Sequence, residues 1–172
     1  MTVILIIAIA VIVLGSYLKN DYLIVREIRI NKPKQQIFNY IKLLRNQNEY
    51  SYYNRKDPNA VKSYSGIDGE VGFTYSWSSK INSIGTGTQT ISKIVEGEEM
   101  CCNIKFTKPL PLKSIAIIAL TAINENETKV TWTFSSFYNF PLNIIIYFVD
   151  LEKLIGEDIA SSLVTLKENL ER

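Results

Sequence analysis

The sequence predicts an α+β domain in which a curved antiparallel sheet of about seven strands wraps around a long C-terminal helix. From Val61 onward, apolar and polar residues alternate over six segments that are separated by turn residues. From Pro141 onward, apolar residues instead recur every three or four positions, as in an amphipathic helix. Because this helix is the only large element left to cover one face of the sheet, we expect the sheet to bend around it.

The first residues are expected to lie outside this domain. Residues 3–14, VILIIAIAVIVL, form an unbroken apolar run, and no charged side chain precedes Lys19. A helix over residues 2–18 would be roughly 25 Å long, slightly short of a hydrocarbon core of about 30 Å. We interpret residues 1–19 as an N-terminal transmembrane helix that anchors the domain of residues 20–172 to a membrane. A cleaved signal segment and a buried core helix are the alternatives.

Charge near the run predicts which side of the membrane holds the domain. Lysines and arginines follow the run closely, at Lys19, Arg26, Arg29, Lys32 and Lys34. Basic residues next to a single span favour the cytoplasmic side. The only two cysteines are adjacent in the sequence, so they are unsuited to bridging each other and fit a reducing compartment. We therefore expect a single-pass membrane protein with a cytoplasmic domain.

The remaining elements follow in order. Residues 22–30 are rich in β-branched residues and predict a first strand. A helix is expected to begin near Asn31 and Pro33, with a second short helix before the turn at 57–59. The six further strands are expected at 61–65, 71–79, 84–95, 99–106, 113–124 and 128–137. The apolar stripe of the terminal helix comprises Ile144, Phe148, Leu151, Ile155, Ile159, Leu163, Leu166 and Leu170.

This order of elements resembles the START-like, or SRPBCC, superfamily with its helix-grip fold, and especially its polyketide cyclase/dehydrase-like branch. The matching strings are INKPKQQIFNYIKLLRN (30–46), KDPNAVKSYSGIDGEVGFTYSW (56–77), IGTGTQTISKI (84–94), TKVTWTF (128–134) and FPLNIIIYFVDLEKLIGEDIASSLVTLK (140–167). The resemblance implies a cavity for a hydrophobic ligand between sheet and helix. The sequence departs from similar proteins in having Tyr50 and Tyr53 where tryptophans are common.

Composition removes several classes of function. The 19 basic and 17 acidic residues nearly balance, so the composition lacks the excess of basic residues that is typical of nucleic-acid-binding proteins. There is no histidine, which is the commonest general base and metal ligand. The GTGT string at 85–88 lacks the lysine of a nucleotide-binding loop, and we interpret its glycines as a bulge or bend in a strand. We expect no metal, no cofactor, no nucleic acid and no identifiable catalytic residue.

Aromatic residues at alternate positions identify the expected ligand site. Phe73, Tyr75 and Trp77 leave one face of the 71–79 strand together with Val71, and other strands carry similar sets. Tyr50, Tyr52, Tyr53 and Tyr64 are expected near the mouth of the cavity. The predicted ligand-binding residues are Tyr53, Phe73, Tyr75, Trp77, Ile104, Phe106, Trp132, Phe134, Phe148 and Leu151. Ordinary core packing against the terminal helix is the alternative.

Three functions stay open at this point. The first is a membrane-tethered module that binds a hydrophobic or amphiphilic small molecule, or a lipid, without transforming it. The second is an enzyme of the cyclase or dehydratase kind, which would need a buried ionisable group with a perturbed pKa facing the cavity. The third is an interaction scaffold with a solid core.

Overall fold

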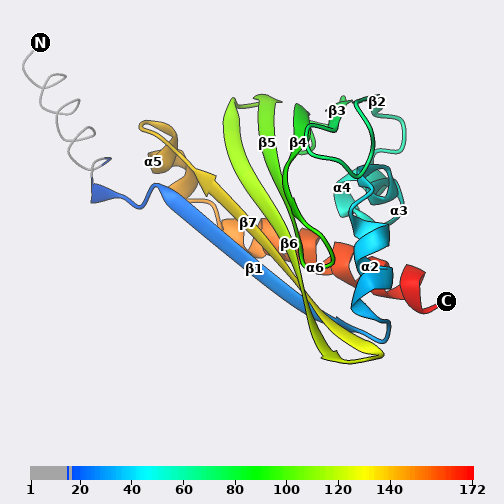
Figure 1. Ribbon diagram of the computed structural model, residues 1–172. Coiled ribbons are helices and arrows are strands. Elements are labelled where there is room, and N and C mark those ends of the chain that lie inside the picture. Colours follow the sequence, from blue (N-terminus) through cyan, green and yellow to red (C-terminus); the bar gives the residue numbers. More distant parts are fainter. Residues whose placement is uncertain (1–14, 16) are drawn as a thin grey trace, which may run out of the picture.

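The computed structural model describes residue 15 and residues 17–172, and it contains one seven-stranded antiparallel sheet (Figure 1). The order across the sheet is β1-β7-β6-β5-β4-β3-β2. The strands are β1 (Asp21–Ile30), β2 (Val61–Ser65), β3 (Thr74–Ser78), β4 (Thr86–Val95), β5 (Glu99–Lys108), β6 (Leu112–Asn124) and β7 (Glu127–Phe137). Only β1 is out of sequence order, since it pairs along its whole length with β7.

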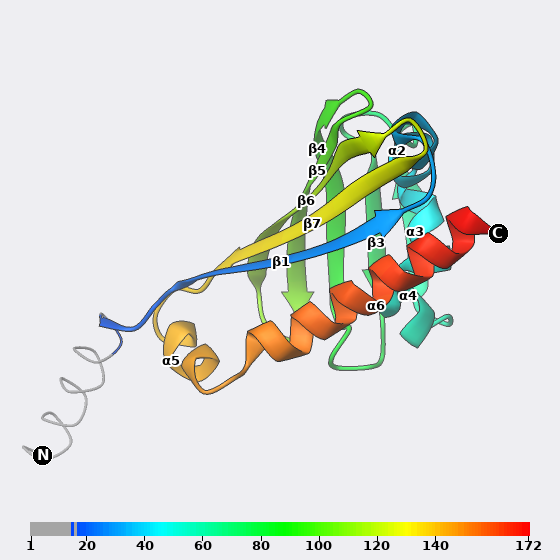
Figure 2. The same ribbon diagram turned by 90° about the horizontal axis from the view of Figure 1, so that it is seen from below.

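From Asp21 onward, the helices lie at two places in the chain. Between β1 and β2 come α2 (Lys34–Ile41), the 3-10 helix η1 (Leu44–Asn46), α3 (Gln47–Tyr50) and α4 (Tyr52–Lys56). After β7 come α5 (Leu142–Tyr147) and α6 (Leu151–Glu171). Figure 2 shows the sheet arching over α6, which runs along the inner face of the sheet. The predicted curved sheet around a C-terminal helix is therefore confirmed.

The predicted terminal helix is wrong in one respect, because it is two helices. Residues 148–150 leave the helical conformation, and the Asp150 carboxylate accepts a hydrogen bond of 2.9 Å from the backbone N–H of Lys153. This bond satisfies a free N–H group at the start of α6 and stabilises a new helix there. The apolar spacing runs through the break, so periodicity alone does not reveal it. As a result Phe148 is 79% exposed.

The strand predicted at 71–79 begins later, at Thr74. The preceding loop contains Gly66, Gly69 and Gly72, all with positive φ, and Val71 lies exposed in it rather than on the inner face. The bulge predicted within the GTGT string is confirmed, since the register between β4 and β5 shifts between Thr86 and Gly87.

The predicted transmembrane helix lies outside the described residues, because 1–14 and 16 are not among them. Within the described part, no helix has the length and apolar character needed to cross a membrane. Gly15, next to the apolar run, lies against α5: its carbonyl oxygen accepts a hydrogen bond of 2.7 Å from the Asn143 side chain. Gly15, the residue that follows the apolar run, therefore lies beside α5.

Candidate ligand-binding cavity

A cavity of about 370 Å³ lies between the inner face of the sheet and the helices α4, α5 and α6. A solid core would have left no such space, because protein interiors normally pack with few voids larger than a water molecule. Its wall is formed by apolar side chains from β3, β5, β6, β7, α5 and α6. The volume is within the range of small-molecule sites, which are concave and mostly apolar.

Eight of the ten residues predicted to bind a ligand line this cavity. They are Tyr53, Tyr75, Trp77, Ile104, Phe106, Trp132, Phe134 and Leu151. Phe73 and Phe148 do not line it. Phe73 is buried but belongs to the closed core, where its ring stacks on Tyr64 with the Arg45 guanidinium nearby. Phe148 points into solvent because of the break between α5 and α6.

Two stacked aromatic rings form one wall, because the centroids of Tyr75 and Trp77 are 5.6 Å apart. Behind them Tyr64, which does not line the cavity, stacks on Tyr75 with centroids 5.3 Å apart. The Tyr75 hydroxyl donates to Asn54 at 3.0 Å, and the Trp77 indole N–H donates to the backbone carbonyl of Ile84 at 3.2 Å. The polar atoms of Tyr75 and Trp77 are thus satisfied within the protein, which leaves their ring faces to contact an apolar molecule.

Trp77 also depends on a glycine beneath it. A Cβ atom on Gly87 would lie 2.6 Å from the Trp77 ring and 2.7 Å from the carbonyl oxygen of Lys105. Only glycine allows the indole to approach the backbone of β4 this closely. The bulge and the glycine together fix where this part of the aromatic wall lies.

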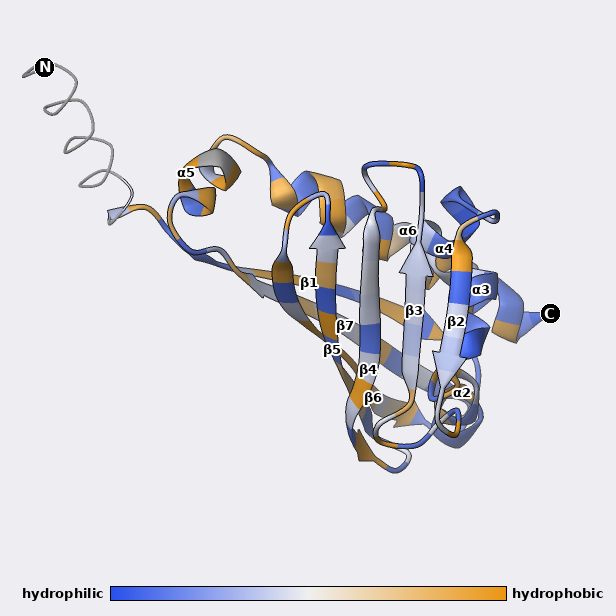
Figure 3. Ribbon diagram, turned by 90° about the horizontal axis from the view of Figure 1, so that it is seen from above, coloured by the Kyte–Doolittle hydropathy of each residue, from blue (hydrophilic) through white to orange (hydrophobic). Residues whose placement is uncertain are grey.

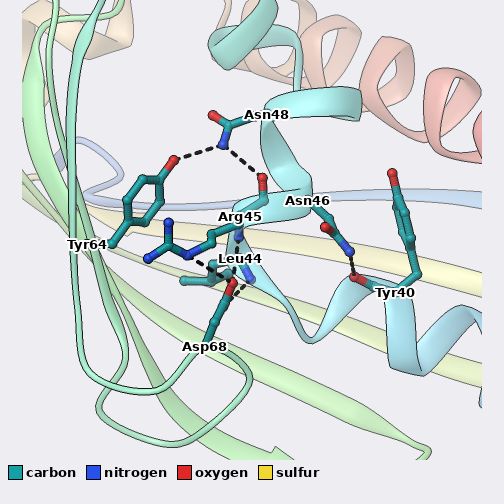
Figure 4. A network of polar contacts seen from close by, with 7 residues as sticks. All are labelled: Tyr40, Leu44, Arg45, Asn46, Asn48, Tyr64 and Asp68. Carbon is teal, nitrogen blue, oxygen red and sulfur yellow. Dashed lines mark hydrogen bonds and ion pairs between the residues drawn. The ribbon is translucent and has the colours of Figure 1, made fainter.

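A network of polar contacts holds the helical segment of η1 and α3 against the sheet (Figure 4). The Asp68 carboxylate accepts hydrogen bonds from the backbone N–H groups of Leu44 and Arg45, at 2.8 and 3.2 Å. The Asn48 amide donates to the Tyr64 hydroxyl and to the Arg45 carbonyl, both at 2.8 Å. These contacts fix the position of α3, whose Gln47 side chain faces the cavity.

Gln47 and Tyr50 of α3 meet Trp132 of β7 in the interior. The Tyr50 and Trp132 rings pack edge to face with centroids 6.3 Å apart. Burial raises the pKa of Tyr50. Cys102 and Tyr40 raise it further, and only the nearby Gln47 amide lowers it. Tyr50 is completely buried, so its predicted place near the mouth is wrong.

An ionisable pair, Tyr53 and Asp158, lines the cavity from α4 and α6. Burial is the main cause that raises the pKa of Tyr53, and the Asp158 carboxylate raises it further. Burial also raises the pKa of Asp158, while the nearby Tyr53 hydroxyl and the charge of Lys56 partly offset that rise. The cavity therefore has one carboxyl group that holds its proton more tightly than an ordinary aspartate.

Exposed apolar side chains surround the part of the cavity formed by α5 and the start of α6. Figure 3 shows hydrophobic colour along α5 and at the beginning of α6. We call this set the apolar rim; it comprises Leu110, Phe140, Tyr147, Phe148, Val149 and Leu154, each of them exposed. Leu110 and Leu154 also line the cavity, so the rim is continuous with it.

Sequence reasoning missed the polar lining residues Gln47, Asn54, Gln89 and Asp158. Gln47 and Asn54 lie on short helices whose polar sequence looks like an exposed surface. Asp158 lies at the edge of the apolar stripe of α6, three residues after Ile155, but an ionisable residue at the edge of a stripe is usually taken as exposed. As for metals, no group of three or more Cys, Asp or Glu side chains in residues 15 and 17–172 is placed to hold an ion.

Comparison with known proteins identifies the fold. No protein-family model matches the sequence, and no curated protein matches it either. Solved structures do match. Mll3558 from Rhizobium loti has a TM-score of 0.63 at 17% identity, covering 86% of this chain and 96% of that one. Norcoclaurine synthase from Thalictrum flavum has a TM-score of 0.61 at 11% identity, with 86% and 94% covered.

A third similar structure, the Aha1 dimer from Colwellia psychrerythraea, has a TM-score of 0.58 at 17% identity, covering 87% and 96% of the two chains. At such identities the likeness concerns the fold. The chain therefore shares the fold of these structures, with a curved antiparallel sheet around a C-terminal helix, as the resemblance predicted.

Proposed function

We propose that this protein binds a hydrophobic or amphiphilic small molecule in the cavity between the sheet and α6, without transforming it. The observation that carries the proposal is an apolar cavity of about 370 Å³, one wall of which is formed by the stacked rings of Tyr75 and Trp77, whose polar atoms are hydrogen-bonded within the protein. Removing apolar ligand surface from water contributes about 25 cal/mol per Å². A filled cavity would therefore give useful affinity without any catalytic group.

The test is to recover the ligand. Full-length protein is purified in a mild detergent and its mass is measured under conditions that keep non-covalent complexes intact. The variant Ala116→Phe places a ring in the cavity, because Ala116 lines it from β6. The matched control Ala122→Phe makes the same change at an exposed position of the same strand. A bound molecule in the wild type and the control, but not in Ala116→Phe, supports the proposal; equal binding by all three contradicts it.

We further propose that the domain is tethered to a membrane by residues 2–18 and that the apolar rim rests on the same bilayer. The chain supports this because the apolar run joins the domain at Gly15, which is hydrogen-bonded to Asn143 of α5. A span that begins beside α5 would hold the exposed Tyr147, Phe148 and Val149 at the membrane surface. The cavity would then open toward lipid, on the cytoplasmic side according to the basic residues that follow the run.

Tryptophan reporters test this orientation. Phe148→Trp and the control Ile67→Trp place an indole at two exposed positions, the first on the apolar rim and the second in the loop before β3. The full chain is reconstituted in vesicles with brominated lipids, which quench nearby indoles. We expect Trp fluorescence to be quenched more strongly in Phe148→Trp than in Ile67→Trp, after subtraction of the wild-type signal. Equal quenching would contradict the orientation.

One observation favours a second function, an acid–base enzyme of the cyclase or dehydratase kind. Asp158 lines the cavity beside Tyr53 and has a raised pKa, which is the feature that such an enzyme requires. The molecules extracted from wild type and Asp158→Asn separate the two functions. A binding module gives the same molecule from both proteins, whereas an enzyme gives product from the wild type and unchanged substrate from the variant.

A further inference from the structure

Two buried glutamines present polar atoms to the cavity. Gln89 of β4 is 7% exposed, Gln47 of α3 is 4% exposed, and both line the cavity. The side-chain carbonyl oxygens of both make no hydrogen bond to the described residues, yet neither oxygen is enclosed, so both keep accessible surface. By contrast, Nε2 of Gln47 and Nε1 of Trp132 are enclosed and cannot reach a ligand. Since roughly 90% or more of buried polar groups are hydrogen-bonded, the two oxygens call for a donor inside the cavity.

Neighbouring side chains turn the nitrogen end of each amide into the protein. Burial raises the pKa of Tyr50 and that of Cys102, and in each case a glutamine amide partly offsets the rise. Gln47 acts on Tyr50 in this way, and Gln89 acts on Cys102. An amide lowers the pKa of an acidic group when its N–H faces that group, because a donor stabilises the charged form. The carbonyl end of each amide therefore points away from Tyr50 and Cys102, neither of which lines the cavity.

The two glutamines belong to one cluster. Gln47 and Tyr50 are three residues apart on α3, so they lie on the same side of this helix. Cys102 is close enough to Tyr50 to add to the rise of its pKa that burial causes. Cys102 is paired with Ile91 of β4, and Gln89 precedes Ile91 by two residues, on the same face of the strand. The two carbonyl oxygens thus approach the cavity from α3 and from the sheet, on either side of the contact between Tyr50 and Cys102.

We infer that the carbonyl oxygens of Gln47 and Gln89 form a subsite for the hydroxyl group of an amphiphilic ligand. A carbonyl oxygen can only accept, so its partner must be a donor. A hydroxyl group donates, whereas the oxygen of a ketone, an ester or an ether does not. The hydrocarbon part of the ligand then lies along the aromatic wall of Tyr75 and Trp77. This inference rests on the proposed binding function and names the class of ligand.

The surroundings of the cluster favour a neutral donor over an ammonium group. Tyr50 and Cys102 have raised pKa values, mainly because they are buried, so both are uncharged at neutral pH. Among the described residues, the carboxylates that line the cavity are Asp57 and Asp158. Asp57 already accepts a hydrogen bond from the Ser79 hydroxyl. A buried cation needs a paired anion, so an ammonium ligand would bind at Asp158 of α6 rather than at the glutamines.

A competition experiment tests the subsite in the full-length protein. The protein, in a non-ionic detergent, is mixed with 2-undecanol and undecane, or with 2-undecanone and undecane, and the bound forms are counted by native mass spectrometry. Wild type is compared with a double variant that combines Gln47→Leu and Gln89→Leu. We expect its alcohol-to-alkane ratio to fall about tenfold, the loss of one hydrogen bond, and its ketone-to-alkane ratio to fall much less. Binding of undecane reports that the variant still folds around its cavity.

The matched control combines Gln35→Leu and Gln36→Leu, the same two changes at exposed positions of α2. It should keep the alcohol-to-alkane ratio of the wild type. The same ratio in wild type and the Gln47/Gln89 double variant would show that water satisfies the two oxygens and would overturn the inference. An equal fall of the ketone-to-alkane ratio would overturn the requirement for a donor. Failure of the wild type to bind any of the three probes would instead overturn the proposed function itself.

Discussion

The length of the ligand chain gives a quantitative test of the cavity. The cavity measures about 370 Å³. At about 30 Å³ per methylene, taken from the volume of a water molecule in the liquid, it holds about 12 such groups. Each buried methylene contributes about 0.8 kcal/mol, which is about a fourfold gain in affinity. In a series of 2-alkanones, we therefore expect the affinity of the wild type to rise about fourfold per carbon and to level off near 12 carbons.

The variant Ala116→Phe should move this plateau. Its ring takes about 100 Å³ from the cavity, so the plateau should fall by three to four carbons at the same volume per methylene. In the assay, two ketones of neighbouring chain length compete for the protein, and the amounts of the two bound forms are compared as a ratio. Partition of the ketones into detergent affects wild type and variant equally, so it cancels when their ratios are compared. Ala122→Phe, at the exposed end of β6, should keep the wild-type plateau. Equal plateaus in Ala116→Phe and Ala122→Phe would refute the reasoning.

Three further predictions concern stability and reactivity. Gly87→Val should lower the free energy of unfolding by about 1–3 kcal/mol in urea, because its side chain would collide with Trp77 and the Lys105 carbonyl; Thr88→Val at the next position should change it by less than about 0.5 kcal/mol. Asp150→Ala should cost about 1 kcal/mol by removing the cap on Lys153, and an unchanged urea midpoint would disprove the cap. Burial raises the pKa of Cys102 to about 12, from an ordinary value of 9.0, so a thiol reagent at pH 8 should label at most Cys101 in the folded protein. Since the folded pKa is the higher one, the stability that Cys102 contributes is complete below pH 9 and should be lost as the pH rises toward 12. Buried tyrosines lose stability over the same range, so Cys102→Ala should lose less stability than the wild type rather than none.

Much of the architecture could be predicted because its signals are local. Alternating apolar residues identify the strands, and the inward direction of Tyr75, Trp77 and Trp132 follows from strand periodicity alone. The helix break at 148–150 could not be predicted from the same kind of signal, since apolar residues continue at helical spacing through it. Only the capping bond from Lys153 to Asp150 shows that a new helix begins there.

The polar part of the site depends on contacts between distant segments. Gln47 reaches the cavity because Asp68, from the loop before β3, fixes the backbone of η1 through two hydrogen bonds. Nothing near Gln47 in the sequence marks it as buried, since its neighbours Asn46 and Asn48 are polar as well. Whether the Trp132 indole N–H has a hydrogen-bond partner likewise depends on residues that are distant in the sequence. An aromatic wall is thus predictable from periodicity, but the polar residues of the lining are not.

The most direct test of the cavity as a ligand site is to map where a bound apolar molecule lies. A straight-chain ketone with an aliphatic diazirine at its far end is bound to the full-length protein, activated by light, and located by peptide mass spectrometry. We expect labels on residues of the inner face, such as Ile104, Phe134 and Leu151, which line the cavity. Labels mainly on the outward-facing Val25 and Ile115, or only on residues 2–18, would contradict the account.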